Sequence, residues 1–272
     1  MDALQAIVLG IVQGLTEFLP VSSTGHLRIV PAFFGWDDPG AAFTAITQLG
    51  TMAAVLVYFR RDLWSIAVAW VRSVLAGERR PTDPNAKLGW YIVLGTIPIG
   101  ILGLAFKDPI ENEFRTLELV GSMLIAFSFV MLWAEARSKR DRELDSLSAR
   151  DGLIIGCAQA LALVPGISRS GATISAGLFL NFDRTTAARY SFVLSVPAVV
   201  LSGLFELRHV GDGGGAPVGA TALATVLAFV VGYLSIAFLL RYLVRHSIGV
   251  FAAYRIAIGA VVLLLAATNV IN

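Results

Sequence analysis

The sequence predicts an all-α integral membrane protein, and three features indicate it: the composition, the length of the apolar windows and the placing of the basic residues. Of 272 residues, 56% are hydrophobic and 15% are charged, against roughly 25% charged in an ordinary soluble domain. A soluble fold could not cover so much apolar surface with so few charges. The formal net charge of +2 gives no indication of nucleic-acid binding, and none is expected.

Six apolar windows are long enough, or nearly so, to cross a bilayer, which takes about 20 residues. They are residues 42–59, 86–106, 117–135, 187–206, 218–240 and 250–270. We therefore expect six transmembrane helices.

Lys and Arg cluster in alternate connections between these windows. Residues 60–88, 137–150 and 241–249 are rich in them, whereas 107–116 and 207–217 are poorer. The positive-inside rule places the basic connections in the cytoplasm. Residues 60–88 are then a cytoplasmic loop, and both termini are expected outside.

The chain contains an internal repeat. A shift of 146 residues aligns 9–25 with 155–171 without a gap, pairing Gln13 with Gln159 and Ser22 with Ser168. Such self-similarity indicates duplication. We divide the chain into a first repeat, 1–145, and a second repeat, 146–272, within one membrane domain.

Each repeat begins with two short apolar arms separated by a proline break. At ~1.5 Å per residue, an arm of about a dozen residues does not cross a ~30 Å hydrocarbon core. We expect re-entrant helical hairpins at 2–35 and 150–181, with tips near mid-membrane, where irregular backbone is tolerated only inside protein or beside water. Three spans, an odd number, separate the hairpins, so the repeats are predicted to be inverted, with the site where they meet. Hairpins that spanned fully would instead give parallel repeats.

Polar side chains gather at the two predicted tips. The first tip carries Gln13, Glu17, Ser22, Ser23, Thr24 and His26, and the second carries Gln159, Ser168, Arg169, Ser170 and Thr173. A charge at membrane depth costs several kcal/mol, so Glu17 and Arg169 are the most informative. Helices that open with Ser or Thr offer free N–H groups and a positive dipole end. With the planar guanidinium added, the predicted guest is a phosphate or a carboxylate.

Structural explanations remain open for each of these residues. Ser22 and Ser168 could be plain helix N-caps, Glu17 and Arg169 a buried ion pair, and His26 a satisfied interior histidine. Together, however, a carboxylate, an imidazole, hydroxyls and a guanidinium contain a base, a proton donor, a nucleophile and an anion clamp. The combination favours catalysis.

Two motifs at these tips resemble the signatures of the bacterial undecaprenyl-diphosphate phosphatases linked to bacitracin resistance. They are GLTEFLPVSSTGH at 14–26 and PGISRSGAT at 165–173. The resemblance covers essentially the whole chain, including QLG at 48–50, ARYSF at 188–192 and YR at 254–255. The first signature is usually written (E/Q)-x-x-x-E, and Gln13 stands where some members have Glu. That departure puts in doubt any metal scheme that needs two glutamates on this helix.

The resemblance implies hydrolysis of undecaprenyl (C55) diphosphate to the monophosphate lipid carrier and inorganic phosphate. This would recycle the carrier for peptidoglycan synthesis and confer bacitracin resistance. It implies Ser23, with Ser22 as the lesser choice, or His26 as nucleophile, and Glu17 as base or metal ligand beside Arg169. Six residues are expected to bind the diphosphate: Gln13, Ser22, Thr24, Ser168, Ser170 and Thr173.

The expected cofactor and partners follow from the same resemblance. A divalent cation, Mg²⁺ or Ca²⁺, is implied by it alone, because the sequence shows no ligand cluster beyond Glu17. The expected partners are a polyprenyl diphosphate, the lipid bilayer and bacitracin, which competes for the substrate; a homodimer is left open. The expected location is the bacterial cytoplasmic membrane, with the site opening to the outer face.

A polyprenyl-phosphate transporter is the alternative function. Inverted repeats with broken helices are typical of transporters, and a flippase would use much the same anion site. A pure transporter has no use for an aligned nucleophile and base, which favours hydrolysis.

Overall fold

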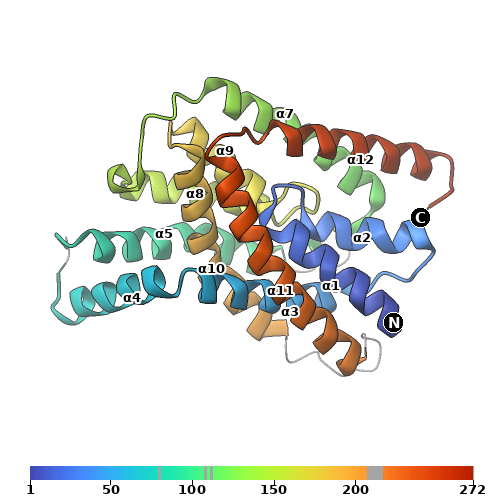
Figure 1. Cartoon of the computed structure of the whole chain (residues 1–272), viewed down its shortest axis with the longest axis horizontal. Helices are drawn as coiled ribbons and strands as arrows, with labels where there is room; N and C mark the ends of the chain where they lie inside the picture. The colour runs from blue at the N-terminus through green and yellow to red at the C-terminus, as the bar shows by residue number, and fades with distance from the viewer. Residues whose placement is uncertain (79–80, 107–108, 111–112, 207–216, 272) are drawn as a thin grey trace.

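The computed structural model describes residues 1–271 except 79–80, 107–108, 111–112 and 207–216, and over these residues the chain folds into α-helices (Figure 1). The helices are α1 (Ala3–Phe18), α2 (Ser23–Phe34), α3 (Gly40–Tyr58), α4 (Arg60–Leu75), α5 (Pro84–Ala105), α7 (Leu117–Arg137), α8 (Ala149–Leu161), α9 (Arg169–Phe179), α10 (Arg184–Glu206), α11 (Val218–Leu243) and α12 (Gly249–Ala267). In the described part of the chain no strand forms, and the one β-bridge joins Arg142 to Phe182. The all-helical class is confirmed.

Five helices are long and apolar enough to cross a membrane: α5, α7, α10, α11 and α12. Each coincides with one of the predicted windows to within a few residues. The sixth window is α3, which meets α4 at an angle of 83° and counts as a span when the bent pair is taken together. The described chain is therefore a multi-pass membrane protein with five, or up to six, membrane-crossing helices.

The expected loop at 60–88 is corrected by the structure, because much of it is the helix α4. Asp62 in its first turn and Arg72 in its last turn both have the charge that the helix dipole favours. Trp70 packs against Gly89 of α5 and lies edge-on to Trp90, with ring centroids 5.7 Å apart. Three of the basic residues that indicated a cytoplasmic loop, Arg60, Arg61 and Arg72, thus belong to a helix that packs against α5 through Trp70.

Both predicted hairpins are pairs of short helices separated by a break. α1 and α2 have 16 and 12 residues, and α8 and α9 have 13 and 11. At ~1.5 Å per residue, each is shorter than a ~30 Å hydrocarbon core. The N-terminus and the end of α2 lie on the same side of the molecule, with the break between the two helices at its centre (Figure 1).

The two breaks end in the same unusual backbone. Ser22 has φ 76° and Ser168 has φ 75°, values that non-glycine residues rarely adopt. Each serine is the N-cap of the helix that follows, and its hydroxyl accepts the N–H of Gly25 or Gly171. These positions are the ones that the sequence repeat aligns, so the repeat has a counterpart in local geometry.

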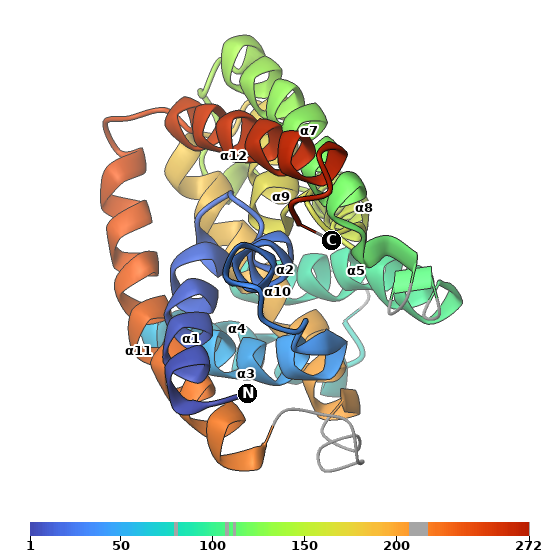
Figure 2. The ribbon, with the colours of Figure 1, turned by 90° about the vertical axis from the view of Figure 1, so that its right-hand side faces the viewer.

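The first helix of each pair is packed closely against a long helix. α1 lies along α11, and α8 lies along α5 (Figure 2). A Cβ on Gly10 would lie 2.6 Å from the carbonyl oxygen of Ala224, and one on Gly156 would lie 2.3 Å from that of Gly95. α7 and α12 lie side by side. This packing brings the two breaks together inside the molecule.

Candidate active site

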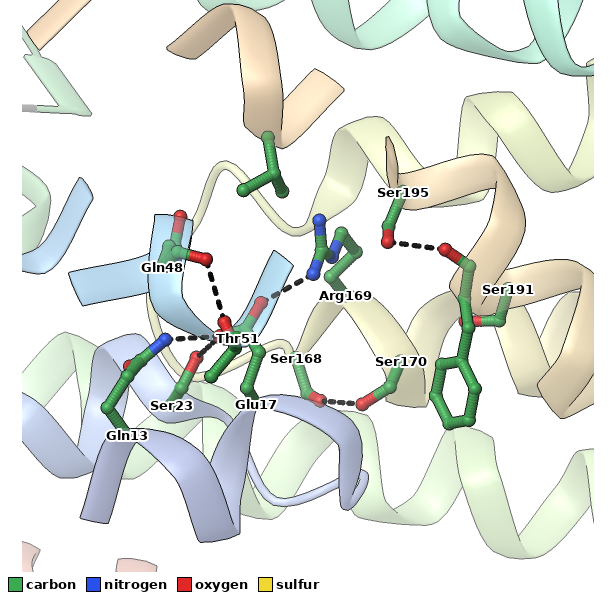
Figure 3. Close-up of polar contacts among 12 residues, drawn as sticks. Gln13, Glu17, Ser23, Gln48, Thr51, Ser168, Arg169, Ser170, Ser191 and Ser195 are labelled. Atoms are coloured by element: carbon green, nitrogen blue, oxygen red, sulfur yellow. Dashed lines mark hydrogen bonds and ion pairs between the residues drawn. The ribbon is translucent and has the colours of Figure 1, made fainter. Parts of the chain in front are cut away.

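Glu17 is the centre of the site. It lies in the last turn of α1, and its side chain is 3% exposed. One carboxylate oxygen accepts hydrogen bonds from Gln13 Nε2 at 2.9 Å and from Ser23 Oγ at 2.5 Å. The other accepts one from Arg169 Nη2 at 2.5 Å. Groups from both broken helix pairs therefore converge on a single carboxylate (Figure 3).

Two polar atoms of this cluster have no partner among the described residues. They are Nη1 of Arg169, the first residue of α9, and Oε1 of Gln13, and both are buried. A buried polar atom left unpaired costs ~1–3 kcal/mol. One donor, Arg169 Nη1, and one acceptor, Gln13 Oε1, are thus free to bind a ligand next to Glu17.

The serines of the two breaks link the breaks to each other. Ser22 Oγ accepts the N–H of Gly166 at 3.2 Å as well as that of Gly25. Ser170 Oγ donates to the carbonyl of Leu19 at 3.2 Å and lies 3.2 Å from Ser168 Oγ. These serines act as helix caps and as cross-links, which is the structural explanation that the sequence left open for them.

His26 does not contact the Glu17 cluster through a hydrogen bond. Its Nδ1 lies 2.8 Å from the carbonyl oxygen of Ser22, and its Nε2 lies 2.8 Å from the hydroxyl of Tyr254 on α12. The His26 and Tyr254 rings are stacked, with centroids 5.6 Å apart. The structure therefore brings Glu17, Ser23 and Arg169 together, and it places His26 against α12.

The remaining predicted residues lie around these groups. Thr173 Oγ1 donates to the carbonyl of Arg169 at 2.8 Å and is 2.5 Å from Ser191 Oγ on α10. Thr24 is half-buried in the first turn of α2. Gln159 is fully buried, and neither of its amide atoms has a partner within the described residues.

Two residues of α12, Tyr254 and Arg255, also contact the site, although in the sequence they stood out only as part of the family resemblance. Arg255 is fully buried and donates to the carbonyls of Pro20, Gly166 and Ile167, one or two in each break. An arginine inside an apolar span is as costly as Glu17 or Arg169. The same cost of a charge at membrane depth therefore singles out Arg255 in the sequence.

A divalent cation would find few ligands at this site. No group of three or more His, Cys, Asp or Glu side chains is arranged to hold a metal ion in the part of the chain that is described. Mg²⁺ is commonly held by one or two carboxylates together with substrate phosphates. Glu17 and the unpaired Oε1 of Gln13 fit such a cation only if a substrate supplies the remaining oxygens.

The fold and the site together define a class: multi-pass helical membrane proteins in which two broken helix pairs meet at a buried cluster of charged and hydroxyl side chains. Within that class, the chain belongs to the family described as Bacitracin resistance protein BacA, which it matches over residues 6–261. The family resemblance stated from the motifs is confirmed.

Several similar proteins carry the name undecaprenyl-diphosphatase. The one from Nocardioides sp. is 50% identical over 272 residues, which is all of this chain and 99% of that one. The one from Mycobacterium sp. strain KMS is 54% identical over 275 residues, again all of this chain and 99% of that one. "Undecaprenyl-diphosphatase 2" of Streptomyces coelicolor is 49% identical over 284 residues, covering all of this chain and 97% of that one.

Proposed function

We propose that this protein hydrolyses undecaprenyl diphosphate to undecaprenyl phosphate and inorganic phosphate, which returns the lipid carrier to peptidoglycan synthesis and confers bacitracin resistance. The observation that carries the proposal is the 2.5 Å contact between Ser23 Oγ and Glu17, with Arg169 on the other carboxylate oxygen. The names of the full-length relatives support the same substrate.

The diphosphate is held by Arg169 and by the helix N-termini at the breaks. The unpaired Nη1 of Arg169 offers a donor next to the one that Glu17 uses, and a guanidinium binds two oxygens of one phosphate in its plane. The first N–H groups of α2 and α9 add the positive ends of two helix dipoles. Binding of the anion competes with Glu17 for Arg169 and so frees the carboxylate.

Ser23 is the nucleophile in this proposal. Its Oγ attacks the terminal phosphorus while its proton passes to Glu17, and the bond from that phosphorus to the bridging oxygen breaks, so that undecaprenyl phosphate leaves. Undecaprenyl phosphate takes that proton from Glu17 as it leaves, which restores the carboxylate. Water then attacks the phosphoserine and gives a proton to Glu17, the bond from phosphorus to Ser23 Oγ breaks, and Ser23 regains the proton as phosphate is released. Arg169 neutralises charge on the transferring group throughout, the main requirement of phosphoryl transfer.

Ser22 and His26, the other two candidate nucleophiles, are already engaged in hydrogen bonds, which favours Ser23. The oxygen of Ser22 already accepts two backbone N–H groups. Both ring nitrogens of His26 are engaged, by Ser22 and Tyr254. A divalent cation held by Glu17, Gln13 Oε1 and the diphosphate would supply charge neutralisation.

The proposal extends to the architecture and its place in the cell. We propose that α1–α2 and α8–α9 are re-entrant hairpins of an inverted-topology repeat, whose tips meet near mid-membrane. The short arms, the matching serine caps and the matched packing of α1 on α11 and α8 on α5 support it. The protein is then in the bacterial cytoplasmic membrane with both termini outside, and its site opens outward, where bacitracin competes for the lipid.

The test is phosphate release from C55 diphosphate by purified full-length protein. Ser23→Ala and Glu17→Gln should each lower the rate ~10³-fold or more, and the double variant should be scarcely worse, because residues that share a transition state lose activity together. Ser23→Ala should still bind the diphosphate lipid, since Arg169 remains. Ser175→Ala, which removes another buried serine hydroxyl, is the matched control and should stay within a few-fold of wild type.

Two results of these assays would contradict or extend the catalytic assignment. If Ser23→Ala and Glu17→Gln both keep near-normal rates, the catalytic assignment is wrong, and flipping of a polyprenyl phosphate in vesicles becomes the activity to measure. Because His26 is a candidate nucleophile in the sequence, His26→Ala is predicted to lose nearly all phosphate release, and the same assay tests this. Repeating it with a chelator tests the cation.

A further inference from the structure

We propose that Arg255 is the positioning residue of the site: it clamps both breaks with one guanidinium and supplies the uncompensated positive charge that attracts the diphosphate. This inference rests on the proposed function. Arg255 lies on α12, far along the sequence from both motifs, 14–26 and 165–173. It reaches the site only through backbone carbonyl groups.

The clamp is formed by a single planar group. Arg255 Nη1 donates to Pro20 of the first break at 3.3 Å and to Ile167 of the second at 3.0 Å, and Nη2 donates to Gly166 at 2.7 Å. Nε donates to the hydroxyl of Ser128 on α7 at 3.1 Å. The two breaks are therefore held to each other and to α7 by a rigid fork, which a lysine could not reproduce.

The charge of Arg255 has no carboxylate opposite it. Its partners are carbonyl and hydroxyl oxygens, and no carboxylate of the described residues forms an ion pair with it. Arg169, by contrast, is paired with Glu17. Since that pair cancels, Arg255 leaves the meeting point of the breaks with one net positive charge.

A fully buried charge without a counter-ion is expensive in a membrane protein. Structural needs alone do not require it, because a neutral amide could also donate to the carbonyls. An anionic substrate bound at the breaks would neutralise the charge and so offset the free energy of burying it. We therefore expect Arg255 to raise the affinity for the anion, in addition to fixing the geometry of Ser23, Glu17 and Arg169.

The experiment measures binding of inorganic pyrophosphate to the purified full-length protein by calorimetry. Arg255→Gln keeps two N–H donors and loses the charge, so its Kd should rise about tenfold or more, as expected for one unit charge at an intermediate dielectric. Arg255→Lys keeps the charge, and at pH 7 its Kd should stay within about threefold of wild type. Arg189→Gln is the matched control, because Arg189 pairs only with Asp62 at the surface, and its Kd should be unchanged.

A pH series on Arg255→Lys provides a readout that a purely structural role would not move. A buried lysine has a lowered pKa and loses its charge at a pH where a guanidinium keeps it. The ratio of variant to wild-type Kd should therefore rise about tenfold between pH 7 and pH 10. Glu17, His26, Tyr254 and pyrophosphate itself are the same in both measurements, so their contributions to the pH dependence cancel in the ratio.

The outcomes separate this inference from the proposed function. A ratio that is constant with pH, or an Arg255→Gln variant that binds like wild type, would sink the inference, as would a wild-type protein that does not bind pyrophosphate. If Arg255→Gln does not fold, the pH series alone decides. Failure to release phosphate from C55 diphosphate, with the binding results as expected, would count against the proposed function and leave the role of Arg255 standing.

Discussion

Glu17 shows why the structural and the catalytic explanations of a buried charge are compatible. Its carboxylate forms a buried ion pair with Arg169, as the structural alternative holds, and it also accepts a hydrogen bond from the Ser23 hydroxyl, as the catalytic alternative requires. In the proposed mechanism, an anion held on Arg169 replaces the ion pair and leaves the same carboxylate free to act as a base. The sequence singled out both charged residues because a charge at membrane depth is costly wherever the chain folds, and the structure brings the two into contact.

Arg169→Lys is predicted to lose most of the activity. The ammonium keeps the charge, but it cannot bind two oxygens of one phosphate through two parallel N–H groups as a guanidinium does. We expect the rate of phosphate release to fall ~10²-fold or more, in line with the loss of a charge-stabilising donor in other enzymes. Rates are compared in folded, detergent-purified protein, with Arg189→Lys as control, and near-normal turnover in Arg169→Lys would make Arg169 a structural partner of Glu17.

Close helix packing is the main feature at the scale of elements. α8 approaches α5 so closely that a Cβ on Gly156 would meet the backbone of Gly95 at 2.3 to 2.7 Å. Small residues permit such approaches and are typical of interfaces between membrane helices. Because α8 leads into the second break, this packing also helps to fix the position of Arg169 beside Glu17.

Gly156→Ala is predicted to destabilise the protein although alanine is the better helix former. The new methyl group meets backbone atoms, which cannot move aside without shifting a helix, so we expect a loss of ~1–3 kcal/mol. Gly100→Ala on α5 is the matched control, because a Cβ there meets nothing within 4 Å. Thermal unfolding in detergent should show a lower midpoint for Gly156→Ala alone, and equal midpoints would show that α8 can move away from α5.

An ion pair joins the connection after α2 to the segment before α7. Arg115 Nη2 lies 2.5 Å from Asp38, whose side chain is 28% exposed. Burial by itself would raise the pKa of the Asp38 carboxyl, but the hydrogen bonds and charge of Arg115 outweigh it and hold the pKa below its ordinary value.

The lowered pKa of Asp38 predicts a stability contribution with a definite pH dependence. A carboxyl with a depressed folded pKa stabilises the fold above its unfolded pKa, ~3.9, and the contribution disappears as the pH falls through the folded value. Asp38→Asn should therefore unfold at a lower temperature than wild type at pH 6, and the difference should shrink steadily below pH 4. A difference that persists unchanged to the lowest pH would assign the effect to something other than the ion pair.

The basic connection 137–150 is held to the rest of the molecule by specific contacts of Arg142. Arg142, in a segment expected to be a solvated loop, pairs with the buried Asp151, and its backbone bridges to Phe182. Burial would raise the pKa of Asp151, but the hydrogen bonds and charge of Arg142 and the hydrogen bonds of Ser148 lower it overall. This basic connection is thus anchored to the start of α8 and to the end of α9.

Cysteine labelling tests the predicted orientation of the whole molecule. In a Cys157→Ala background, a cysteine replacing the exposed Asp37 should react with an impermeant thiol reagent on intact cells, because the connection after α2 is placed outside. One replacing the exposed Asp145 should react only after permeabilisation, because the basic connection is placed inside. The reverse pattern would invert the orientation and the opening of the site. Gly213, in the connection 207–217 that is also expected outside, lies outside the described residues.

The sequence by itself determined the membrane class, the helix windows, the two broken segments and the residues at their tips. These follow from local properties: apolar length, proline breaks and the cost of a charge in lipid apply wherever a segment comes to lie. Only the tertiary structure decided that Ser23 faces Glu17 while His26 faces Tyr254, and that Arg255 holds both breaks. Those contacts join residues as much as 235 positions apart, and their direction depends on how α12, α7 and the broken helices pack, which no local pattern encodes.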